Sequence, residues 1–307
     1  MRHGYLTVNK ERGITSHQVI AALRRILKQT EIGHTGTLDP EAEGVLVVGL
    51  GQATRSFSFL DESIKVYRAE VILGRQTDTQ DKSGKVIAEH PGFCLTLAEI
   101  QKAIAGFIGT TQQIPPMFSA VKLQGQKLYD LARRGIEVER KPRPVTVYSW
   151  TIENPRNTYG FQEHFDSIIT CSKGAYIRTL INDLGLKLGC GAHMGALLRI
   201  RSGIFRLENA VTLKQIEERS ASGCLDELLM PISKALGHLP SVYPSDEDLL
   251  KVKNGGKLSF AKYNQPMAPG SLIKALEVET DRTIAVLKLE DNGSYCFWQP
   301  VKVFHYD

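Results

Sequence analysis

An aspartate stands next to a proline just before an apolar run, in the stretch GHTGTLDPEAEG that covers residues 33–44. Pro40 biases Asp39 toward an extended backbone, and glycines on both sides allow another backbone to come close. One interpretation is a type I turn, with the aspartate first and the proline second. The other is an active site, because an ionised carboxylate beside the apolar strand predicted at 45–50 is costly unless it has a partner.

Arg178 is the candidate partner for that carboxylate. It lies in the first turn of a helix that the sequence predicts at residues 175–188. A cation at this end opposes the helix dipole by about 0.3–1 kcal/mol at an exposed site. A carboxylate would compensate for it and would itself stay ionised. A solvated surface arginine is the alternative interpretation, and spacing alone favours it.

Two further side chains could contact a nucleobase. Tyr67 shares one face of a predicted strand, residues 65–73, with apolar residues. It is therefore either a core tyrosine whose hydroxyl finds a partner or a platform on which a base stacks. His34 precedes Asp39 by five residues, but no third ligand with suitable spacing lies nearby, so we expect no metal site. Two interpretations of His34 stay open: its side chain donates a hydrogen bond within the protein, or it contacts RNA.

The segment 117–148 is rich in positive charge. Its basic residues are Lys122, Lys127, Arg133, Arg134, Arg140, Lys141 and Arg143, and its acids are Asp130, Glu137 and Glu139. A charge run is most often a solvated face, but the interleaved aromatic residues Phe118, Tyr129 and Tyr148 favour contact with nucleic acid. The net charge of +5 for the whole chain permits such a partner without requiring it.

These residues need helices and strands to position them. Helices are predicted at residues 16–29, 96–107, 127–134, 175–188, 212–220 and 225–230, and strands at 45–50, 65–73 and 167–171. Ser16 is the expected cap of the first helix, and Thr96 with Glu99 is the expected capping box of the second. Strands and helices do not alternate regularly, so we predict an α+β fold with a mixed sheet rather than a doubly wound one.

A change of composition near residue 240 predicts two domains. The stretch GHLPSVYP, residues 237–244, is typical of a linker, and short strands with Gly and Asn turns follow it. We therefore expect a large domain at residues 1–238 and a small, mainly β domain at residues 239–307. The small domain is close to the lower limit of about 50 residues for an independent domain.

The composition is that of an ordinary globular protein. The 307 residues are 42% hydrophobic and 23% charged. No run approaches the ~20 apolar residues that span a membrane, and the N-terminus has no apolar core of a signal peptide, so we expect a cytoplasmic protein. The five cysteines are odd in number and widely spaced, which favours neither a disulfide framework nor a zinc ribbon. No cofactor fingerprint occurs, and we predict no cofactor.

Four stretches together resemble the TruB family of bacterial tRNA pseudouridine-55 synthases. They are GHTGTLDPEAEGVLVVGLGQATR at 33–55, KVYRAEVILGRQTDTQDKSGKV at 65–86, IPPMFSAVKLQGQKLYDLARRGIEVERKPRPVTVY at 114–148 and CSKGAYIRTLINDLGLKLGCGAH at 171–193. The resemblance covers nearly the whole chain. It implies the pseudouridine synthase fold, in which a mixed, largely antiparallel central sheet has flanking helices. It also implies an RNA-binding insertion at about 117–148 and a PUA-like C-terminal domain.

The resemblance implies a role for each matching residue. Asp39 matches the catalytic aspartate, and Arg178 matches the arginine that pairs with it. Tyr67 matches the tyrosine that stacks on the target uracil. Tyr176 matches a tyrosine that lines the pocket, and Leu197 matches a leucine beneath the base.

Two further matches lie in the N-terminal part of the chain. His34 matches a histidine that inserts into the RNA where the flipped base had been, and Lys10 matches a basic motif near the pocket. The chain departs from the family at Glu11, where proline is usual, and at Leu198, where arginine is usual. Neither departure touches Asp39, so we expect them to affect affinity and not activity.

The resemblance implies that the protein isomerises uridine 55 in the T-loop of tRNA. The ionised aspartate would act on the ribose of a flipped-out uridine, either as nucleophile at C1′ or as base at C2′. The implied partner is the T-arm stem-loop of tRNA, with no membrane, no protein partner and a monomeric enzyme. Two alternatives stay open. One is an RNA-binding or RNA-folding module, and the other is a carboxylate glycosidase, for which Glu41 and Glu43 are the nearest second acids and are expected to be turn residues.

Overall fold

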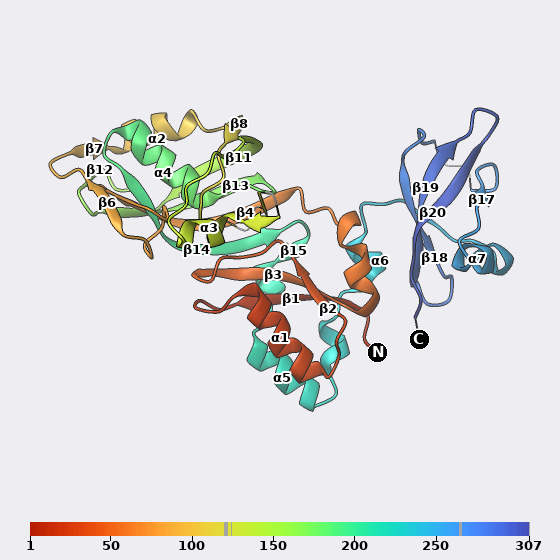
Figure 1. Cartoon of the computed structure of the whole chain (residues 1–307). Helices are drawn as coiled ribbons and strands as arrows, with labels where there is room; N and C mark the ends of the chain where they lie inside the picture. Colours follow the sequence, from red (N-terminus) through yellow and green to blue (C-terminus); the bar gives the residue numbers. More distant parts are fainter. Residues whose placement is uncertain (120–121, 124, 264–265, 307) are drawn as a thin grey trace. The chain divides into compact units, whose positions relative to one another are not determined.

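The computed structural model describes residues 1–307 apart from 120–121, 124, 264–265 and 307. The chain forms two compact units (Figure 1). Unit 1 comprises residues 1–40, 45–61 and 203–307, and unit 2 comprises residues 41–44 and 62–202. The domain boundary expected at residue 238 stays a prediction. Residues 120–121 and 124 of the expected RNA-binding insertion lie outside the described residues.

Unit 1 begins with a strand, a helix and a hairpin. These are β1 (Gly4–Lys10), α1 (Ser16–Leu27), β2 (Ile32–Thr35) and β3 (Ala42–Leu50), of which residues 45–50 belong to this unit. The first helix is confirmed, but the prediction that Ser16 caps it is wrong. Thr15 is the N-cap: its hydroxyl accepts the N–H of Gln18, and the Gln18 side chain accepts the N–H of Thr15. This capping box leaves the Ser16 hydroxyl to bind another segment.

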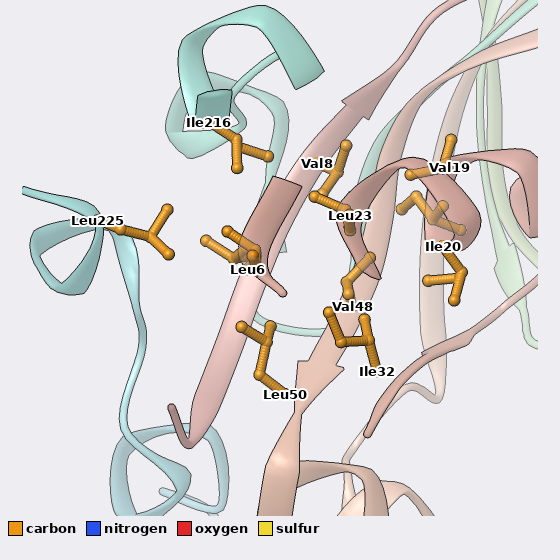
Figure 2. Packing of buried hydrophobic residues seen from close by; sticks show 12 residues of the cluster. Leu6, Val8, Val19, Ile20, Leu23, Ile32, Val48, Leu50, Ile216 and Leu225 are labelled. Carbon is orange, nitrogen blue, oxygen red and sulfur yellow. The ribbon is translucent and has the colours of Figure 1, made fainter. Parts of the chain in front are cut away.

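One apolar cluster joins α1 to β1, β2 and β3 (Figure 2). Val19, Ile20 and Leu23 face one side of α1. They pack against the strand residues Leu6, Val8, Ile32, Val48 and Leu50, and Ile216 and Leu225 complete the cluster. Full burial of such a side chain contributes about 1.5–3 kcal/mol. The cluster therefore fixes the hairpin of β2 and β3 against the helix.

Short helices dominate the later part of unit 1. They are η1 (Gly51–Phe59), η2 (Leu207–Asn209), α5 (Leu213–Ala221), η3 (Leu225–Leu228) and α6 (Ile232–Ala235), with the strand β15 (Phe205–Arg206) before η2. α5 confirms the helix expected at 212–220. The helix expected at 225–230 is wrong in type and extent, because η3 is a 3-10 turn that ends at Leu228. Met230 instead exchanges two backbone hydrogen bonds with Tyr5.

The chain from residue 241 onward forms a five-stranded sheet with one helix. The strand order is β16 (Ser241–Val242), β18 (Leu272–Leu276), β19 (Thr283–Asp291), β20 (Cys296–Val303) and β17 (Leu258–Ser259), with α7 (Asp246–Lys253) packed on it. Trp298 is fully buried in its core. The small, mainly β C-terminal part is thus confirmed. Val286 and Phe304 also join a cluster with Tyr5 and Val47, which belong to the same unit.

Unit 2 is built on one sheet. Its strand order is β14 (Ala192–Ser202), β4 (Ile64–Leu73), β13 (His164–Ser172), β11 (Arg143–Glu153) and β8 (Gly109–Gln113). These neighbours are antiparallel, whereas residues 42–44 of β3 pair with β14 in parallel. The predicted mixed, largely antiparallel sheet is confirmed. α2 (Leu97–Ala105) and α4 (Ile177–Leu188) contact each other, and α4 also contacts β14 and β4 (Figure 1).

Shorter elements of unit 2 lie between these strands. β5 (Arg75–Thr77) pairs with β6 (Val86–Glu89), β7 (Cys94–Thr96) with β12 (Thr158–Gly160), and β9 (Lys122–Leu123) with β10 (Gln126–Lys127). α3 (Leu128–Arg133) confirms the short helix in the basic segment, and Thr96 with Glu99 forms the expected capping box of α2. Within the described ranges, no helix is long and apolar enough to cross a membrane.

The five cysteines are free thiols. Cys171, in β13, is fully buried, as its place in an apolar strand predicts. Burial raises the pKa of the Cys171 thiol to about 12. At neutral pH this side chain therefore stays protonated and acts as a small apolar residue of the sheet.

Gly44 lies where β3 pairs with β14, opposite Arg199. Its φ is +97°, and a Cβ atom there would overlap the backbone carbonyl oxygen of Arg199. We expect Gly44→Ala to lower the free energy of unfolding by at least about 2 kcal/mol, because a left-handed φ alone costs roughly 1–2 kcal/mol outside glycine. Urea unfolding measures the change.

Gly13→Ala is the matched control for that variant. Gly13 has a φ of +86°, but no heavy atom lies within 4 Å of the position that its Cβ would take. The control therefore carries the backbone strain without the overlap. Equal losses of stability in the two variants would contradict the role of the close approach at Gly44.

Candidate active site

The loop between β2 and β3 carries Asp39 and is fixed next to that residue. β2 and β3 are antiparallel, and residues 36–41 connect them. The hydroxyl of Ser16, which is 1% exposed, donates to the carbonyl of Leu38 over 3.1 Å and accepts the N–H of Leu38 over 3.0 Å. Asp39 itself is half-buried. The carboxylate thus stands on a loop whose preceding residue is tied to α1.

The amino group of Lys10 holds the same loop on the other side of Asp39. Lys10 is 1% exposed, and its Nζ donates to the carbonyls of Glu11, Ile14 and Pro40 over 2.9, 2.7 and 3.1 Å. The N–H of Gly13 also donates to the Pro40 carbonyl, over 2.9 Å. Because Glu11 contributes its backbone carbonyl here, a proline could supply the same contact. This explains why the departure at Glu11 preserves the arrangement.

His34 lies in β2 and is half-buried. Its ring contacts the ring of His17 at the start of α1, with centroids 5.3 Å apart and planes nearly perpendicular. Among the residues that the structure describes, no group of three His, Cys, Asp or Glu side chains is arranged to hold a metal ion. Unit 1 therefore carries Lys10, His34 and Asp39, with the aspartate as its candidate reactive group.

In unit 2, Tyr67 and Leu197 lie on the same face of the sheet. Leu197 of β14 pairs with Ala69 of β4, two residues beyond Tyr67, and cross-strand partners share a face. Tyr67 and Leu197 are both 8% exposed. Together they form an aromatic and apolar surface of the kind on which a base can lie. Leu198, the second departure, pairs with Arg68 and therefore faces the other side of the sheet.

Arg178 lies in the first turn of α4 and is only 5% exposed. The alternative of a solvated surface arginine is therefore wrong. Its Nη1 lies 3.4 Å from Oδ2 of Asp81, and its Nη2 donates to the carbonyl of Phe118 over 2.5 Å. Its guanidinium carbon is 5.9 Å from the centroid of the Tyr176 ring. The pairing of Arg178 with Asp39 stays a prediction.

Asp81 is a site residue that sequence reasoning missed, because its stretch was expected to be only a polar turn. It is 8% exposed, and its Oδ1 accepts from the Thr79 hydroxyl over 2.8 Å and from the N–H and hydroxyl of Ser83 over 2.9 and 2.5 Å. Met194 of β14 exchanges backbone hydrogen bonds with this loop. Hydroxyl residues two positions before and after an acid were the signal for such a buried carboxylate.

Tyr67 lies between two buried cations that the sequence did not reveal. Lys65 precedes it on the same face, and Arg199, which is 2% exposed, pairs with it across β4 and β14. Nζ of Lys65 donates to Oε1 of Glu62 and to the hydroxyl of Ser202, both over 2.6 Å. Burial lowers the pKa of the Lys65 ammonium, with Glu62 opposing this effect and Arg199 adding to it. The charge of Lys65 is thus paired with the carboxylate of Glu62, and Arg199 lies beside Tyr67 in the sheet.

The two units thus each carry part of the expected site. Lys10, His34 and Asp39 belong to unit 1, and Tyr67, Tyr176, Arg178 and Leu197 belong to unit 2. Within unit 2 the structure brings Tyr176 beside Arg178, and Tyr67 and Leu197 onto one face. By itself, the fixed loop of unit 1 presents a carboxylate in a set position, and unit 2 presents an aromatic and apolar face and a buried arginine.

Comparisons with known protein families and structures identify the family of the chain. Residues 24–177 match the TruB family pseudouridylate synthase N-terminal domain, and residues 178–237 match the tRNA pseudouridylate synthase B C-terminal domain. The tRNA pseudouridine synthase B of Geobacillus thermodenitrificans (strain NG80-2) is 42% identical over 303 residues, covering 98% of this chain and 99% of the relative. That of Bacillus subtilis (strain 168) is 40% identical, covering 93% of each.

Solved structures show the same fold. A chain of a Cbf5-Nop10-Gar1 complex aligns with a TM-score of 0.72 and 27% identity, covering 98% of this chain and 84% of that chain. A chain of an H/ACA RNP bound to a substrate RNA containing 2'-deoxyuridine aligns with a TM-score of 0.71 and 25% identity, covering 99% and 85%. The fold and the family matches assign the chain to the pseudouridine synthases, which are RNA-modifying isomerases. The chain belongs to the TruB family of that class.

The buried contact between Asp81 and Arg178 gives a prediction for stability. Removing one partner of a buried ion pair takes away a counter-charge and hydrogen-bonding oxygen atoms from a charge that stays inside the protein. We therefore expect Asp81→Ala to lower the free energy of unfolding by about 3 kcal/mol. Asp78→Ala is the control in the same loop, because Asp78 is exposed, and it should cost less than about 1 kcal/mol. Comparable losses in urea unfolding would argue against the buried pair.

Proposed function

We propose that this enzyme converts uridine to pseudouridine at position 55 in the T-loop of tRNA, with Asp39 acting on the ribose of a flipped-out uridine. The observation that carries the proposal is the fixed backbone on both sides of Asp39. Leu38 is hydrogen-bonded to the Ser16 hydroxyl, and Pro40 is hydrogen-bonded to the Lys10 amino group. A catalytic group gains most when its position is set before the substrate arrives. The match to TruB relatives over nearly the whole chain supports the same assignment.

The reaction is an isomerisation and needs no external reactant. The bond between C1′ and N1 breaks, the uracil turns, and C5 bonds to C1′. C5 then loses its proton to a base, and N1 takes up a proton. The carboxylate of Asp39 serves either as nucleophile at C1′ or as base at C2′. Because no electrons enter or leave, no redox cofactor is required. The acceptor of the C5 proton is Tyr67 or water.

The other site residues hold the base and the RNA. Taking a base out of its stack costs a few kcal/mol, and the buried face of Tyr67 and Leu197 offers a surface that replaces part of this stacking. His34 fills the gap that the base leaves. The predicted pairing of Arg178 with Asp39 keeps the carboxylate ionised. Tyr176 completes the wall of the pocket.

The substrate in this proposal is the T-arm stem-loop of tRNA, bound by a monomeric enzyme in the cytoplasm. Family relatives named for tRNA support a tRNA substrate. The basic segment 117–148 supplies contacts to phosphates, with Lys141 and Arg143 exposed next to β11. An RNA-binding module with secondary catalysis is the second candidate. The fixed position of Asp39 favours the enzyme, because binding alone would not require an immobilised carboxylate.

The proposal predicts that Asp39→Asn keeps RNA affinity and loses turnover. The amide preserves the shape of the side chain and removes its charge. We expect the single-turnover rate constant to fall at least about 1000-fold, which corresponds to about 4 kcal/mol of activation free energy. The measurement is tritium release from C5-labelled uridine in an unmodified T-arm stem-loop. Turnover by Asp39→Asn at the wild-type rate would refute the assigned role.

Glu41→Gln and Glu43→Gln are the matched controls, because they remove the two acids nearest to Asp39 in sequence. Both should release tritium at close to the wild-type rate. A glycosidase would need a second catalytic acid and would release free uracil. Free uracil formed by wild type without tritium release, and lost in either variant, would support the glycosidase instead, because hydrolysis leaves the C5 hydrogen in place.

Binding of the stem-loop should weaken steeply with salt, because neutralised phosphates release counterions. Replacing Lys141 and Arg143 by Gln should reduce the slope of log K against log salt by roughly one for each phosphate that is no longer neutralised. Lys214→Gln, on the exposed surface of α5, is the control and should leave the slope unchanged. Phosphate neutralisation changes affinity roughly over the range from 50 to 200 mM salt. If the affinity of the wild type for the stem-loop does not change over this range, phosphate binding by the basic segment is excluded.

A further inference from the structure

A buried glutamine ends β8 at the point where the chain leaves the sheet. Gln113 is the last residue of β8 and pairs with Arg143 of β11. Its side chain is 4% exposed, whereas the preceding Gln112 is exposed. Successive side chains of a strand point to opposite faces, so only Gln113 points into the protein. A buried amide requires hydrogen-bond partners.

Both polar atoms of this amide bind the backbone of Tyr176. The N–H of Tyr176 donates to Oε1 of Gln113 over 2.8 Å, and Nε2 of Gln113 donates to the carbonyl of Tyr176 over 3.1 Å. The two residues are 63 positions apart in the sequence. The side-chain amide thus pairs with this one residue in the way that the backbone of a neighbouring strand would.

Tyr176 begins α4 without support from its own side chain. It is the N-cap residue, with an extended backbone at φ −95° and ψ 108°, and its phenol makes no capping hydrogen bond. Ser, Thr, Asp and Asn are preferred at this position because their oxygens bind the free N–H groups of the first turn. Without such a cap, the direction in which the helix starts depends on contacts from outside. Gln113 provides them.

The backbone of Tyr176 determines where two groups of the site lie. One is its own ring, and the other is the guanidinium of Arg178, which follows two residues later and lies 5.9 Å from that ring. A rotation of the peptide groups that flank Tyr176 would displace both groups together. The same arginine holds the carbonyl of Phe118, so the entrance to the basic segment would shift as well.

We propose that Gln113 is a positioning residue for the isomerisation catalysed by this enzyme. Its amide fixes the backbone of Tyr176, and through it the Tyr176 ring and the Arg178 guanidinium, without touching the substrate. This rests on the proposed function, which places Tyr176 and Arg178 at the target base. β8 does not need the amide for its own place in the sheet, because its backbone pairs with β11 from Gly109 to Gln113.

Gln113→Met tests the proposal, because it keeps the length of the side chain and removes both hydrogen bonds. In single-turnover conversion of the T-arm stem-loop we expect the rate constant to fall by about 10- to 100-fold. The Kd for the RNA should stay within about threefold of wild type. Gln112→Met is the matched control on the exposed side and should keep the wild-type rate constant. A wild-type rate constant for Gln113→Met would overturn the proposal.

A double-mutant comparison separates positioning from a general loss of structure. In a Tyr176→Ala background, Gln113→Met should reduce the rate constant by a smaller factor than in wild type, because the ring is gone and only the Arg178 guanidinium is left to displace. Effects that multiply fully would overturn the proposal. Gln113→Asn, whose amide is one methylene too short to reach, serves if the methionine variant does not fold, and it should show the same loss.

Asp39→Asn is measured beside these variants. If wild type turns over and Asp39→Asn does not, while Gln113→Met and Gln113→Asn are fully active, only the positioning role fails. If wild type itself releases no tritium from the stem-loop, the proposed function fails. The two failures are therefore distinguishable in one set of assays.

Discussion

Positive charge inside the protein is the constraint on which the site depends. Five cationic side chains among the described residues are between 1% and 5% exposed: Lys10, Lys65, Arg178, Arg199 and, in the C-terminal sheet, Lys274. Removing such a group from water is costly unless oxygen atoms surround it at hydrogen-bonding distance. For Lys10 these oxygens are backbone carbonyls, and for Lys65 they come from an acid and a hydroxyl. The segments that supply them lose their freedom to move.

The buried hydrogen bonds of these cations and of Ser16 hold loops in fixed positions. Lys10 draws the backbone after Asp39 toward the end of β1, and Ser16 holds the backbone before it. Arg178 joins the loop of Asp81 to the carbonyl of Phe118. Functional loops are usually the mobile parts of a fold. Here, buried hydrogen bonds position the loops as accurately as helices and strands are positioned. Catalysis by positioned groups requires such accuracy.

A redox-neutral isomerisation fits a site of this kind. Such a reaction requires one carboxylate with a fixed position, a surface on which a base can lie, and an environment shielded from water, where electrostatic interactions are strong. The sheet of unit 2 offers such a surface at Tyr67 and Leu197, and the basic residues of the segment 117–148 suit an anionic RNA. Membership of the TruB family and the buried contacts of the chain therefore support the same chemistry from independent directions.

The local features and the candidate residues follow from the sequence alone. Period-two alternation placed Tyr67 on the buried face of β4, helical spacing placed α1 and α4, and the motif stretches indicated Asp39 and Arg178. Only the tertiary structure decided the partners: Asp81 lies 97 positions from Arg178, and Gln113 lies 63 positions from Tyr176. Periodicity reports which side of an element is buried, because it reflects the geometry of that element alone. It cannot report what a buried polar group meets there, because that depends on how distant segments pack.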